Sequence, residues 1–430
     1  MTPTDYFDST RAVELVRKCV SQELRPGAPL PHDEVDLVRE EHIDSMGWVG
    51  VLTAIEDATR IPHFGSSWPE ERPQNIRSLV ELMLQPQDAA VKDAASPATL
   101  KIESVNAEVS IVGWGVAPGS LRIDATTIER ECGLETGTIR ERAGIESVCR
   151  AADHENELTL GLQAAEAALE AATLNPENVD VVVVTSATFL SLPSLAATLH
   201  NRLLLRESCG AFDVGGACVA VIHALATAKA LLSAAQREVA LVVASEVNSR
   251  RLSSPQVPGE FRGLFGDGAC AFVLSRSDSS PSHAPSKLGS FVWGCAGDSA
   301  SALHVGLHQS GDVAVQFNGK QLGQAAVSQL DRVVGELENL TGRSRATIDY
   351  FAIHEPNPRL VSVFAKTAGI PQEKLASISR THGNLGSATC GASLCRCLTE
   401  AQSNRTSARR PMIFVAAVGP GLLWGGTYIH

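Results

Sequence analysis

The feature that most constrains this fold is an alternation of short β-branched runs with alanine-rich stretches, which begins at Val109. The β-branched runs have the length of single strands, and the alanine-rich stretches are long enough for helices. Alternation of this kind is typical of α/β layers with buried strands. The strand-like runs are residues 109–112, 179–185, 239–244 and 269–274, and the helical stretches are residues 158–172 and 219–235.

This alternating region also repeats itself. Its first half carries a valine-rich strand (DVVVVTSA), then FDVGGAC opening an alanine-rich helix, then a further strand (EVALVVASE). Its second half carries DYFAIHE, then HGNLGSATCGASL opening a helix, then MIFVAAVG. The spacing of about 170–190 residues is too long for a solenoid and indicates a duplicated βα unit. We therefore predict two fused halves, residues 107–280 and residues 281–430.

Residues 1–85 differ in character from the rest of the chain. They contain fifteen Asp and Glu against eight Lys and Arg, so this fifth of the chain carries a net charge of −7. Apolar residues at helical spacing mark one face near residues 12–20 and another near residues 46–58, and a last helix is expected near residues 76–84. We predict a small acidic helical bundle, followed by a flexible Ala/Ser/Pro-rich linker over residues 86–106.

Composition excludes several other classes of protein. The chain has 430 residues and a net charge of −12, so it lacks the basic balance typical of nucleic-acid-binding proteins. No run of about 18 apolar residues is free of polar breaks, and the first residues lack the apolar core of a signal peptide. Ten cysteines, several within apolar runs, are typical of a reducing compartment. We expect a soluble cytoplasmic protein that binds neither nucleic acid nor membrane.

Cys218 is the first candidate for catalysis. In FDVGGACVAVIHALATAKALL a strand ends, two glycines allow a tight turn, and the cysteine opens a long helix. The partial positive charge at a helix N-terminus favours a thiolate, which is a good nucleophile toward thioesters. The alternative is a small buried apolar residue, the usual role of a free cysteine. Another group of cysteines lacks CxxC spacing and a histidine cluster, so we expect no metal site at Cys390, Cys395 and Cys397.

His354 and Asn384 are the candidates from the second half. His354, in AIHEPNPRL, directly follows a predicted strand, and a residue at the C-terminal end of a strand in an α/β layer is well placed to face a site. Asn384, in RTHGNLGSA, precedes a helix of small residues, and its amide can donate a hydrogen bond to a developing oxyanion. Taken singly, His354 could be a core or loop histidine and Asn384 a turn residue. Together with Cys218 they occupy strand-to-helix junctions of two related halves.

Ser45 lies in EEHIDSMGWVGVLTAIEDATRI, where Asp44-Ser45 precedes an amphipathic helix. Serine and aspartate are favoured at helix N-caps, so the pair could simply begin the helix. The alternative is a serine that carries a covalent group. The residues alone leave both possibilities open.

Residues 1–85 resemble an acyl carrier domain, because HIDSMGWVGVLTAIEDATRI is similar to the family's motif around its modified serine. The resemblance implies that Ser45 carries a 4′-phosphopantetheine arm, attached by a phosphopantetheinyl transferase. On this basis the small all-α bundle is an acyl carrier domain that delivers an acyl group as a thioester.

Residues 107–430 resemble a β-ketoacyl-ACP synthase III, a condensing enzyme of the thiolase fold. FDVGGAC is similar to the nucleophile motif, HEPNPRL to the segment with the catalytic histidine, and HGNLGSA to the segment with the catalytic asparagine. The resemblance implies catalytic roles for Cys218, His354 and Asn384. It also implies two duplicated βα halves layered α-β-α-β-α, a homodimer, and two substrates: an acyl thioester (acyl-ACP or acyl-CoA) and a malonyl-type thioester. The acyl group arrives on the fused carrier or on a separate carrier protein.

Three positions depart from the family pattern. Thr138 or a neighbour replaces the tryptophan that often stacks on the adenine of coenzyme A. The C-terminal glycine triplet becomes Gly419-Pro420-Gly421, and proline has no N–H to donate to an oxyanion. Gly215-Gly216 precedes the cysteine in place of bulkier residues. These departures predict weaker coenzyme A recognition and a pocket of altered shape.

The favoured hypothesis is a decarboxylative Claisen condensation, in fatty-acid or polyketide-type metabolism. Cys218 takes the acyl group, and His354 and Asn384 stabilise the enolate formed when the malonyl-type thioester loses carbon dioxide. The first alternative is an acyltransferase in which His354 deprotonates an alcohol or amine acceptor without decarboxylation. The second is a non-catalytic partner that docks carriers, against which the presence of Cys218 counts.

Overall fold

The computed structural model describes residues 9–24, 28–38, 40, 42–43, 45–59, 75–84, 108–234, 237–276, 286–297, 303–307, 312–404 and 410–430. The predicted linker, residues 86–106, lies outside these described residues. The chain divides into two compact units, one around the N-terminal helices and one around a large sheet.

The N-terminal unit is built around the helices α1 (Ser9–Glu23), α2 (Ser45–Thr59) and α3 (Ile76–Leu84). These helices coincide with the helical faces predicted from the sequence. Their apolar faces share one core, in which Val16, Trp48 and Leu79 are almost completely buried. The burial of these faces is the main source of stability for helices this short. The identity of this unit as an acyl carrier domain stays a prediction.

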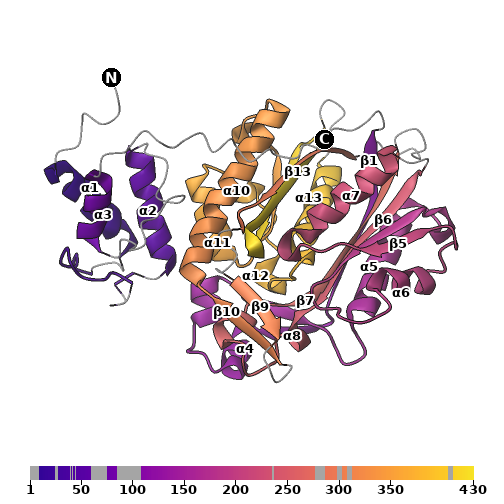
Figure 1. Cartoon of the computed structure of the whole chain (residues 1–430), viewed down its shortest axis with the longest axis horizontal. Coiled ribbons are helices and arrows are strands. Elements are labelled where there is room, and N and C mark those ends of the chain that lie inside the picture. Colours follow the sequence, from indigo (N-terminus) through magenta and orange to yellow (C-terminus); the bar gives the residue numbers. More distant parts are fainter. Residues whose placement is uncertain are drawn as a thin grey trace. The chain divides into compact units, whose positions relative to one another are not determined.

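The larger unit is built on a nine-stranded mixed sheet (Figure 1). Its order is β11-β12-β13-β8-β1-β7-β6-β4-β5, so the strands of the first half occupy one side and those of the second half the other. Strand β4 pairs in parallel with β6, as β11 does with β12, which is the pairing expected of a duplicated βα unit. The strands are β1 (Val109–Pro118), β4 (Val181–Thr185), β5 (Gly210–Asp213), β6 (Val239–Val247), β7 (Asp267–Arg276), β8 (Ser286–Cys295), β11 (Tyr350–Ile353), β12 (Ile413–Gly419) and β13 (Leu423–Ile429).

Two alanine-rich helices lie between the halves of the sheet. Figure 1 shows α7 (Ala220–Ala234) and α13 (Ala388–Ser403) between β13 and β6, and one apolar core joins them to strands of both halves. Small side chains on these helices let the two sheet halves approach closely. By length and composition alone, the stretch Ala217–Ala234 could span a membrane, but in the described structure 56% of it is buried.

The outer layers complete the architecture. Helices α5 (Glu157–Ala172) and α6 (Leu195–Arg202) cover the opposite face of the first-half strands. On the second half, Val333 of α10 (Gly319–Thr341) packs against Gly426 of β13. The layers are therefore α-β-α-β-α, and the α/β fold predicted for this region is confirmed.

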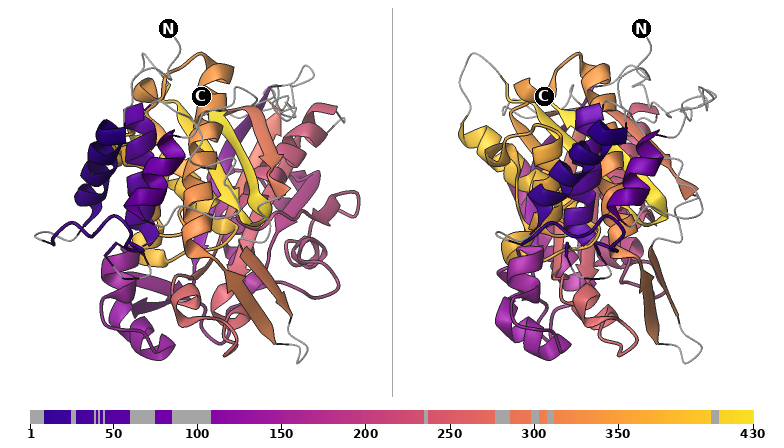
Figure 2. Two further views of the ribbon diagram at one scale, coloured as in Figure 1. Left: turned by 60° about the vertical axis from the view of Figure 1, so that its left-hand side comes forward. Right: turned by 90° about the vertical axis from the view of Figure 1, so that its left-hand side faces the viewer.

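Smaller elements lie at one end of the sandwich. The hairpin β9–β10 (Leu303–Leu307 and Val313–Phe317) shares an apolar cluster with Phe261 of α9 (Gly259–Arg262). Both views of Figure 2 show the hairpin beside the segment that contains α9. The other short elements are β2 (Leu121–Asp124), α4 (Ala125–Cys132), β3 (Ser147–Arg150), α8 (Asn248–Arg251), α9 (Gly259–Arg262), α11 (Pro358–Thr367) and α12 (Ser379–His382).

Candidate active site

Cys218 lies where the first half passes from strand β5 to helix α7. Gly216 has a φ of +140° and Ala217 a φ of +47°, so the chain turns sharply just before the cysteine. Glycine adopts a positive φ without penalty, which explains why it occupies this turn. Cys218 then lies in a short 3₁₀ turn, Ala217–Val219, that leads into α7. The predicted strand–Gly-Gly–helix junction is confirmed.

A histidine that the motif comparison did not single out supports this turn. The ring nitrogen Nδ1 of His223 lies 3.1 Å from the carbonyl oxygen of Gly215. A Cβ on Gly216 would lie only 2.4 Å from the same nitrogen, so no side chain fits there without displacing the imidazole. The ring also makes an edge contact with Trp293, with 5.8 Å between centroids. His223 follows Cys218 by about one and a half helical turns, so helical spacing alone gave no signal of its contact with the turn.

The surroundings of Cys218 favour the thiol over the thiolate. Burial raises its pKa to about 12, and the neighbouring Glu246 carboxylate adds to the shift. The expectation that the helix N-terminus would favour a thiolate is therefore wrong for the free enzyme. The cost of moving a charge out of water exceeds the stabilisation by the helix dipole, which is about 0.3–1 kcal/mol. A nucleophilic role for Cys218 would therefore require a base that removes the thiol proton.

Glu246, at the end of β6, is a second residue that sequence reasoning missed. Its side chain is fully buried and accepts hydrogen bonds from the backbone N–H groups of Ala187 (2.9 Å) and Thr188 (3.0 Å). It also accepts a hydrogen bond from the Ser387 hydroxyl, at the start of α13. Glu246 therefore ties the loop after β4 to the helix start in the second half. Burial raises the pKa of this carboxyl.

His354 directly follows β11, as predicted. Its backbone N–H donates to the carbonyl of Ala416 in β12, at 2.8 Å. The side chain is only 2% exposed, and within the described structure its buried Nδ1 has no hydrogen-bond partner. Burial lowers the imidazole pKa to about 4, so the ring is neutral at physiological pH. A neutral imidazole can both accept and donate one proton, which suits a catalytic group.

Asn384 has a fixed amide orientation. Its Oδ1 accepts hydrogen bonds from the Gly386 N–H (3.0 Å) and from the Thr389 hydroxyl (2.9 Å). Both partners are donors, so they identify this atom as the oxygen and leave Nδ2 as a donor for another group. The backbone is anchored to the first half, because the Asn384 N–H donates to the carbonyl of Leu264 at 2.8 Å. The side chain is 3% exposed.

The structure brings the three predicted residues to one end of the sandwich. Gly419, at the end of β12, lies against the nucleophile: a Cβ placed on it would be 3.0 Å from Cβ of Cys218. His354 is bonded to the same strand. Cys390, in the first turn of α13, lies against the same strand, because its thiol contacts the Ala416 carbonyl at 3.7 Å.

The Gly-Pro-Gly segment borders this site. Pro420 begins a 3₁₀ turn, Pro420–Leu422, and it has no N–H to donate. Gly421 has a φ of +114°, which explains a glycine at that position. The backbone N of Cys218 lies 3.4 Å from the Cβ position of Gly419, so the N–H of the nucleophile itself lies beside this segment.

Ser45 is the first residue of α2. Its side chain and Asp44 lie outside what the structure describes, so the choice between an N-cap and a covalent attachment stays open. Within the described residues, no group of three or more His, Cys, Asp or Glu side chains is arranged to hold a metal ion.

Comparison with known proteins places these observations in a family. The family described as "FAE1/Type III polyketide synthase-like protein" matches residues 128–341, and "3-Oxoacyl-[acyl-carrier-protein (ACP)] synthase III C terminal" matches residues 339–430. The β-ketoacyl-[acyl-carrier-protein] synthase III of Rhizobium meliloti is 30% identical over 74% of this chain and 98% of its own length.

Solved structures agree with this placement. The 3-oxoacyl-[acyl-carrier-protein] synthase III of Aquifex aeolicus superposes with a TM-score of 0.65 and 25% identity, covering 75% of this chain and 99% of that one. A priming β-ketosynthase of a polyketide biosynthetic pathway shares the fold, with a TM-score of 0.66 and 24% identity over 75% of this chain and 96% of that one. The two family matches together cover residues 128–430, so residues 1–85 lie outside them.

Proposed function

Because the chain belongs to the β-ketoacyl-[acyl-carrier-protein] synthase III family, we propose that it joins an acyl group to a malonyl-type thioester by decarboxylative Claisen condensation. The observation that carries this proposal is the pair of groups from the second half. The Asn384 amide is held with its nitrogen available, and the buried His354 imidazole is neutral. His354 is hydrogen-bonded to β12, whose end lies against Cys218, and Asn384 precedes the start of α13, where Ser387 is hydrogen-bonded to Glu246.

The first half-reaction acylates Cys218. Its sulfur attacks the carbonyl carbon of an acyl thioester while the thiol proton passes to a base, for which the neutral imidazole of His354 is the candidate in this site. The tetrahedral oxyanion is held by backbone N–H groups at the turn before α7, and the N–H of Cys218, beside Gly419, is the first candidate. The intermediate collapses to acyl-Cys218, and the carrier thiol leaves with the proton.

The second half-reaction forms the carbon–carbon bond. The thioester carbonyl of the malonyl-type substrate accepts hydrogen bonds from His354 and from Nδ2 of Asn384. These donors stabilise the enolate that forms as carbon dioxide leaves, each by about 3–4 kcal/mol. The enolate carbon then attacks the acyl carbon on Cys218, the carbon–sulfur bond breaks, and the Cys218 thiolate takes up a proton from solvent water.

The test is mass spectrometry of the full chain combined with a carbon dioxide assay. Incubation with an acyl thioester should add one acyl group to Cys218, and malonyl-type thioester should then release carbon dioxide together with a β-ketoacyl product. Acyl transfer to an alcohol or amine with no carbon dioxide released would replace this proposal by the acyltransferase alternative. Full condensation by a Cys218→Ala variant would overturn the role of the cysteine.

We further propose that residues 1–85 are an acyl carrier domain with 4′-phosphopantetheine on Ser45. Support comes from the packed helices α1–α3 in an acidic segment and from the place of Ser45 at the first position of α2, where the N-terminal end of the helix favours a phosphate. When attached, the arm supplies a terminal thiol that holds a substrate as a thioester. The acyl group then arrives on this fused carrier, on a separate carrier protein or on coenzyme A, and fusion would raise the effective concentration to about the millimolar range.

This second proposal has its own test. A phosphopantetheinyl transferase with coenzyme A should add one phosphopantetheinyl mass to the wild-type chain and none to Ser45→Ala. The matched control is Ser21→Ala, which removes a serine hydroxyl of α1 that donates to the Lys18 carbonyl one helical turn away. This control should be modified like wild type. Equal modification of Ser45→Ala and wild type would overturn the assignment.

A homodimer is the assembly we propose. Strand β5 ends the nine-stranded sheet on one side, and leucines in the loops that flank β4 and β5 are unusually exposed. Their exposed fractions are 64% for Leu190, 93% for Leu192 and 83% for Leu204. Light scattering after size exclusion should give twice the chain mass, and Leu192→Asp should shift it toward the monomer. A wild-type monomer at micromolar concentration would refute the assembly.

A further inference from the structure

Glu355 directly follows His354, and the mechanism proposed above gives it no role. Its side chain is only 3% exposed, and a buried carboxylate is costly unless hydrogen bonds satisfy its oxygens. Three donors satisfy it, all from one short segment of the second half. They are the Ser377 hydroxyl (2.9 Å), the Ile378 N–H (2.8 Å) and the Ser379 N–H (2.7 Å). The carboxylate therefore fastens the residues after β11 to the segment that ends at Ser379.

This segment runs beside β11 in parallel register. Phe351 of β11 pairs with Leu375, and the Ala376 N–H donates to the Phe351 carbonyl at 3.2 Å. Four residues further along both segments, the Glu355 side chain is hydrogen-bonded to Ser379. Its carboxylate thereby extends the contact between the two segments beyond the end of β11.

Ser379 begins the helical turn that leads to Asn384. Helix α12 closes with the Gly383 N–H donating to the Ser379 carbonyl at 3.0 Å, and Asn384 is the next residue. Two consecutive N–H groups at the start of this helix donate to one oxygen of Glu355. These amides have no acceptor within the helix, so the carboxylate supplies the one they need. Only five residues of chain then separate the anchored Ser379 from the side-chain amide of Asn384.

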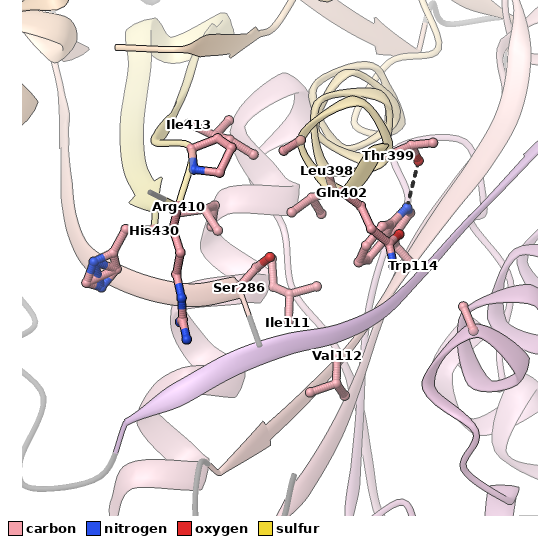
Figure 3. Close-up of a pocket in the computed structure, with 14 residues that line it drawn as sticks. Ile111, Val112, Trp114, Ser286, Leu398, Thr399, Gln402, Arg410, Ile413 and His430 are labelled. Atoms are coloured by element: carbon pink, nitrogen blue, oxygen red, sulfur yellow. Dashed lines mark hydrogen bonds between the residues drawn. The ribbon is translucent and has the colours of Figure 1, made fainter. Parts of the chain in front are cut away.

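The amide is also held to the first half of the large unit. The Asn384 N–H donates to the Leu264 carbonyl at 2.8 Å. In helix α13, which follows, the Thr399 hydroxyl accepts a hydrogen bond from Nε1 of Trp114 in β1 (Figure 3). These bonds fix the amide against the first half, whereas the carboxylate connects it to the segment that carries the imidazole.

Glu355 acts on its neighbours through the backbone and not through its charge. Burial alone lowers the pKa of the His354 imidazole. A carboxylate in direct contact with the ring would raise that pKa instead. The carboxylate is therefore suited to hold the chain in place, as a positioning residue and not as a catalytic one.

We propose that Glu355 sets the separation between the His354 imidazole and the Asn384 amide. This inference rests on the condensation proposed above, in which acylation of Cys218 uses the imidazole but not the amide, and decarboxylation uses both. If the separation changes, the enolate oxygen can no longer accept both hydrogen bonds, and misplacements of this kind are costly. Loss of the carboxylate should therefore slow carbon dioxide release while acylation continues.

The first experiment compares substitutions at Glu355 in the full chain. Glu355→Ala removes the acceptor of two buried N–H groups, and we expect carbon dioxide release to fall about 10–100-fold while acylation of Cys218 stays within about threefold of wild type. Glu355→Gln keeps the shape and an acceptor oxygen, so both steps should stay within about threefold of wild type. The matched control is Glu373→Ala, which removes an exposed carboxylate from the turn Gln372–Lys374 and should behave like wild type.

A double-mutant cycle tests whether the effect passes through Asn384. In an Asn384→Asp background the amide donor is already absent, so adding Glu355→Ala should lower carbon dioxide release by less than about threefold. The same substitution in the wild-type background should have its full effect. If the two effects simply multiply, the carboxylate acts independently of the amide and the inference is wrong.

Wild type is measured first, which separates this inference from the proposed function. If wild type forms acyl-Cys218 but releases no carbon dioxide, the condensation fails and this inference fails with it. If wild type condenses, equal losses in Glu355→Gln and Glu355→Ala would show that charge matters and not position, against the inference. Equal losses of acylation and carbon dioxide release in Glu355→Ala would also contradict it. Urea titration checks that each variant is folded, and Glu355→Asp, which shortens the side chain by one methylene, takes the place of Glu355→Ala if that variant unfolds.

Discussion

The two halves of the large unit build the same junction from a strand and a helix, yet they use it differently. In the first half the turn before α7 has positive φ at Gly216 and Ala217 and presents a sulfur nucleophile. In the second half the start of α13 is preceded by Asn384, whose amide is held by hydrogen bonds. The comparison teaches that duplication supplies two equivalent positions around one site. In the mechanism proposed above, the first half provides the sulfur that forms the covalent bond, and the second half provides the base and the hydrogen-bond donors.

The largest expected effect comes from removing the Cys218 sulfur, which tests the contribution of the first half. Cys218→Ala should lower condensation by roughly 10³-fold or more, because the acyl thioester forms on the Cys218 sulfur. Mass spectrometry should show no acyl group on the variant chain. Cys132→Ala, which removes a cysteine of α4 instead, should acylate like wild type.

Removing the donor from the second half should leave the first half-reaction intact. Asn384→Asp keeps the shape of the side chain but replaces the amide N–H donor with a carboxylate oxygen. We expect carbon dioxide release to fall by about 10²–10³-fold while acylation of Cys218 continues. The two steps are measured separately, by carbon dioxide release and by protein mass. Loss of acylation together with decarboxylation would show that the halves do not divide the work in this way.

The lowered pKa of the His354 imidazole predicts that the stability of the fold depends on pH. Its pKa is about 4 in the folded protein and about 6.5 when unfolded, so below pH 6.5 the unfolded chain takes up a proton that the folded chain does not. The free energy of unfolding should therefore fall between pH 6.5 and pH 4, by an amount on the order of 3 kcal/mol, and this contribution should level off below pH 4.

The measurement compares urea unfolding of wild type and His354→Gln across this range. The difference between the two curves isolates the imidazole from the other groups that titrate. Parallel curves would contradict the lowered pKa. The Cys218 thiol adds nothing to this difference, because burial raises its pKa to about 12.

Replacing the glycines at the two junctions should have smaller effects, which appear in the free energy of unfolding. Gly216→Ala forces a methyl group against His223 and needs a φ of +140°, so we expect a loss of about 1–3 kcal/mol in the free energy of unfolding. Gly386→Ala needs a φ of +60° and places a Cβ 3.1 Å from Cγ of Glu246, so it should lower the free energy of unfolding by about 1 kcal/mol. Gly215→Ala meets no atom within 4 Å and should be close to neutral. Urea titrations of the three variants give the order directly.

Local sequence was sufficient where a residue type and its neighbours determine the backbone. The two glycines before Cys218 predicted the turn, and the alternation of strands and helices predicted the layers. His354 and Asn384 were also located correctly at their junctions, because each adjoins a recognisable strand or helix start. Their catalytic roles stay predictions until the variants are measured.

Features that depend on packing between distant segments were not accessible from the sequence. The raised pKa of Cys218 arises from burial and from Glu246, which lies 28 positions away in the chain and is held there by the loop after β4. The contact between His223 and the Gly215 carbonyl exists only in the folded chain, so the sequence did not reveal it. Ser45 is a different case. Its motif is local and easily found, but a sequence does not show whether the serine carries a covalent group.

The protonated state of Cys218 has a consequence for the lifetime of the enzyme. Peroxides and other oxidants attack thiolates far faster than thiols, and overoxidation to sulfinic acid is normally irreversible. A sulfur that ionises only while substrate is present spends little time in its vulnerable form. Burial, and to a smaller extent the Glu246 carboxylate, raises the pKa of this thiol and would thereby slow its oxidation between turnovers.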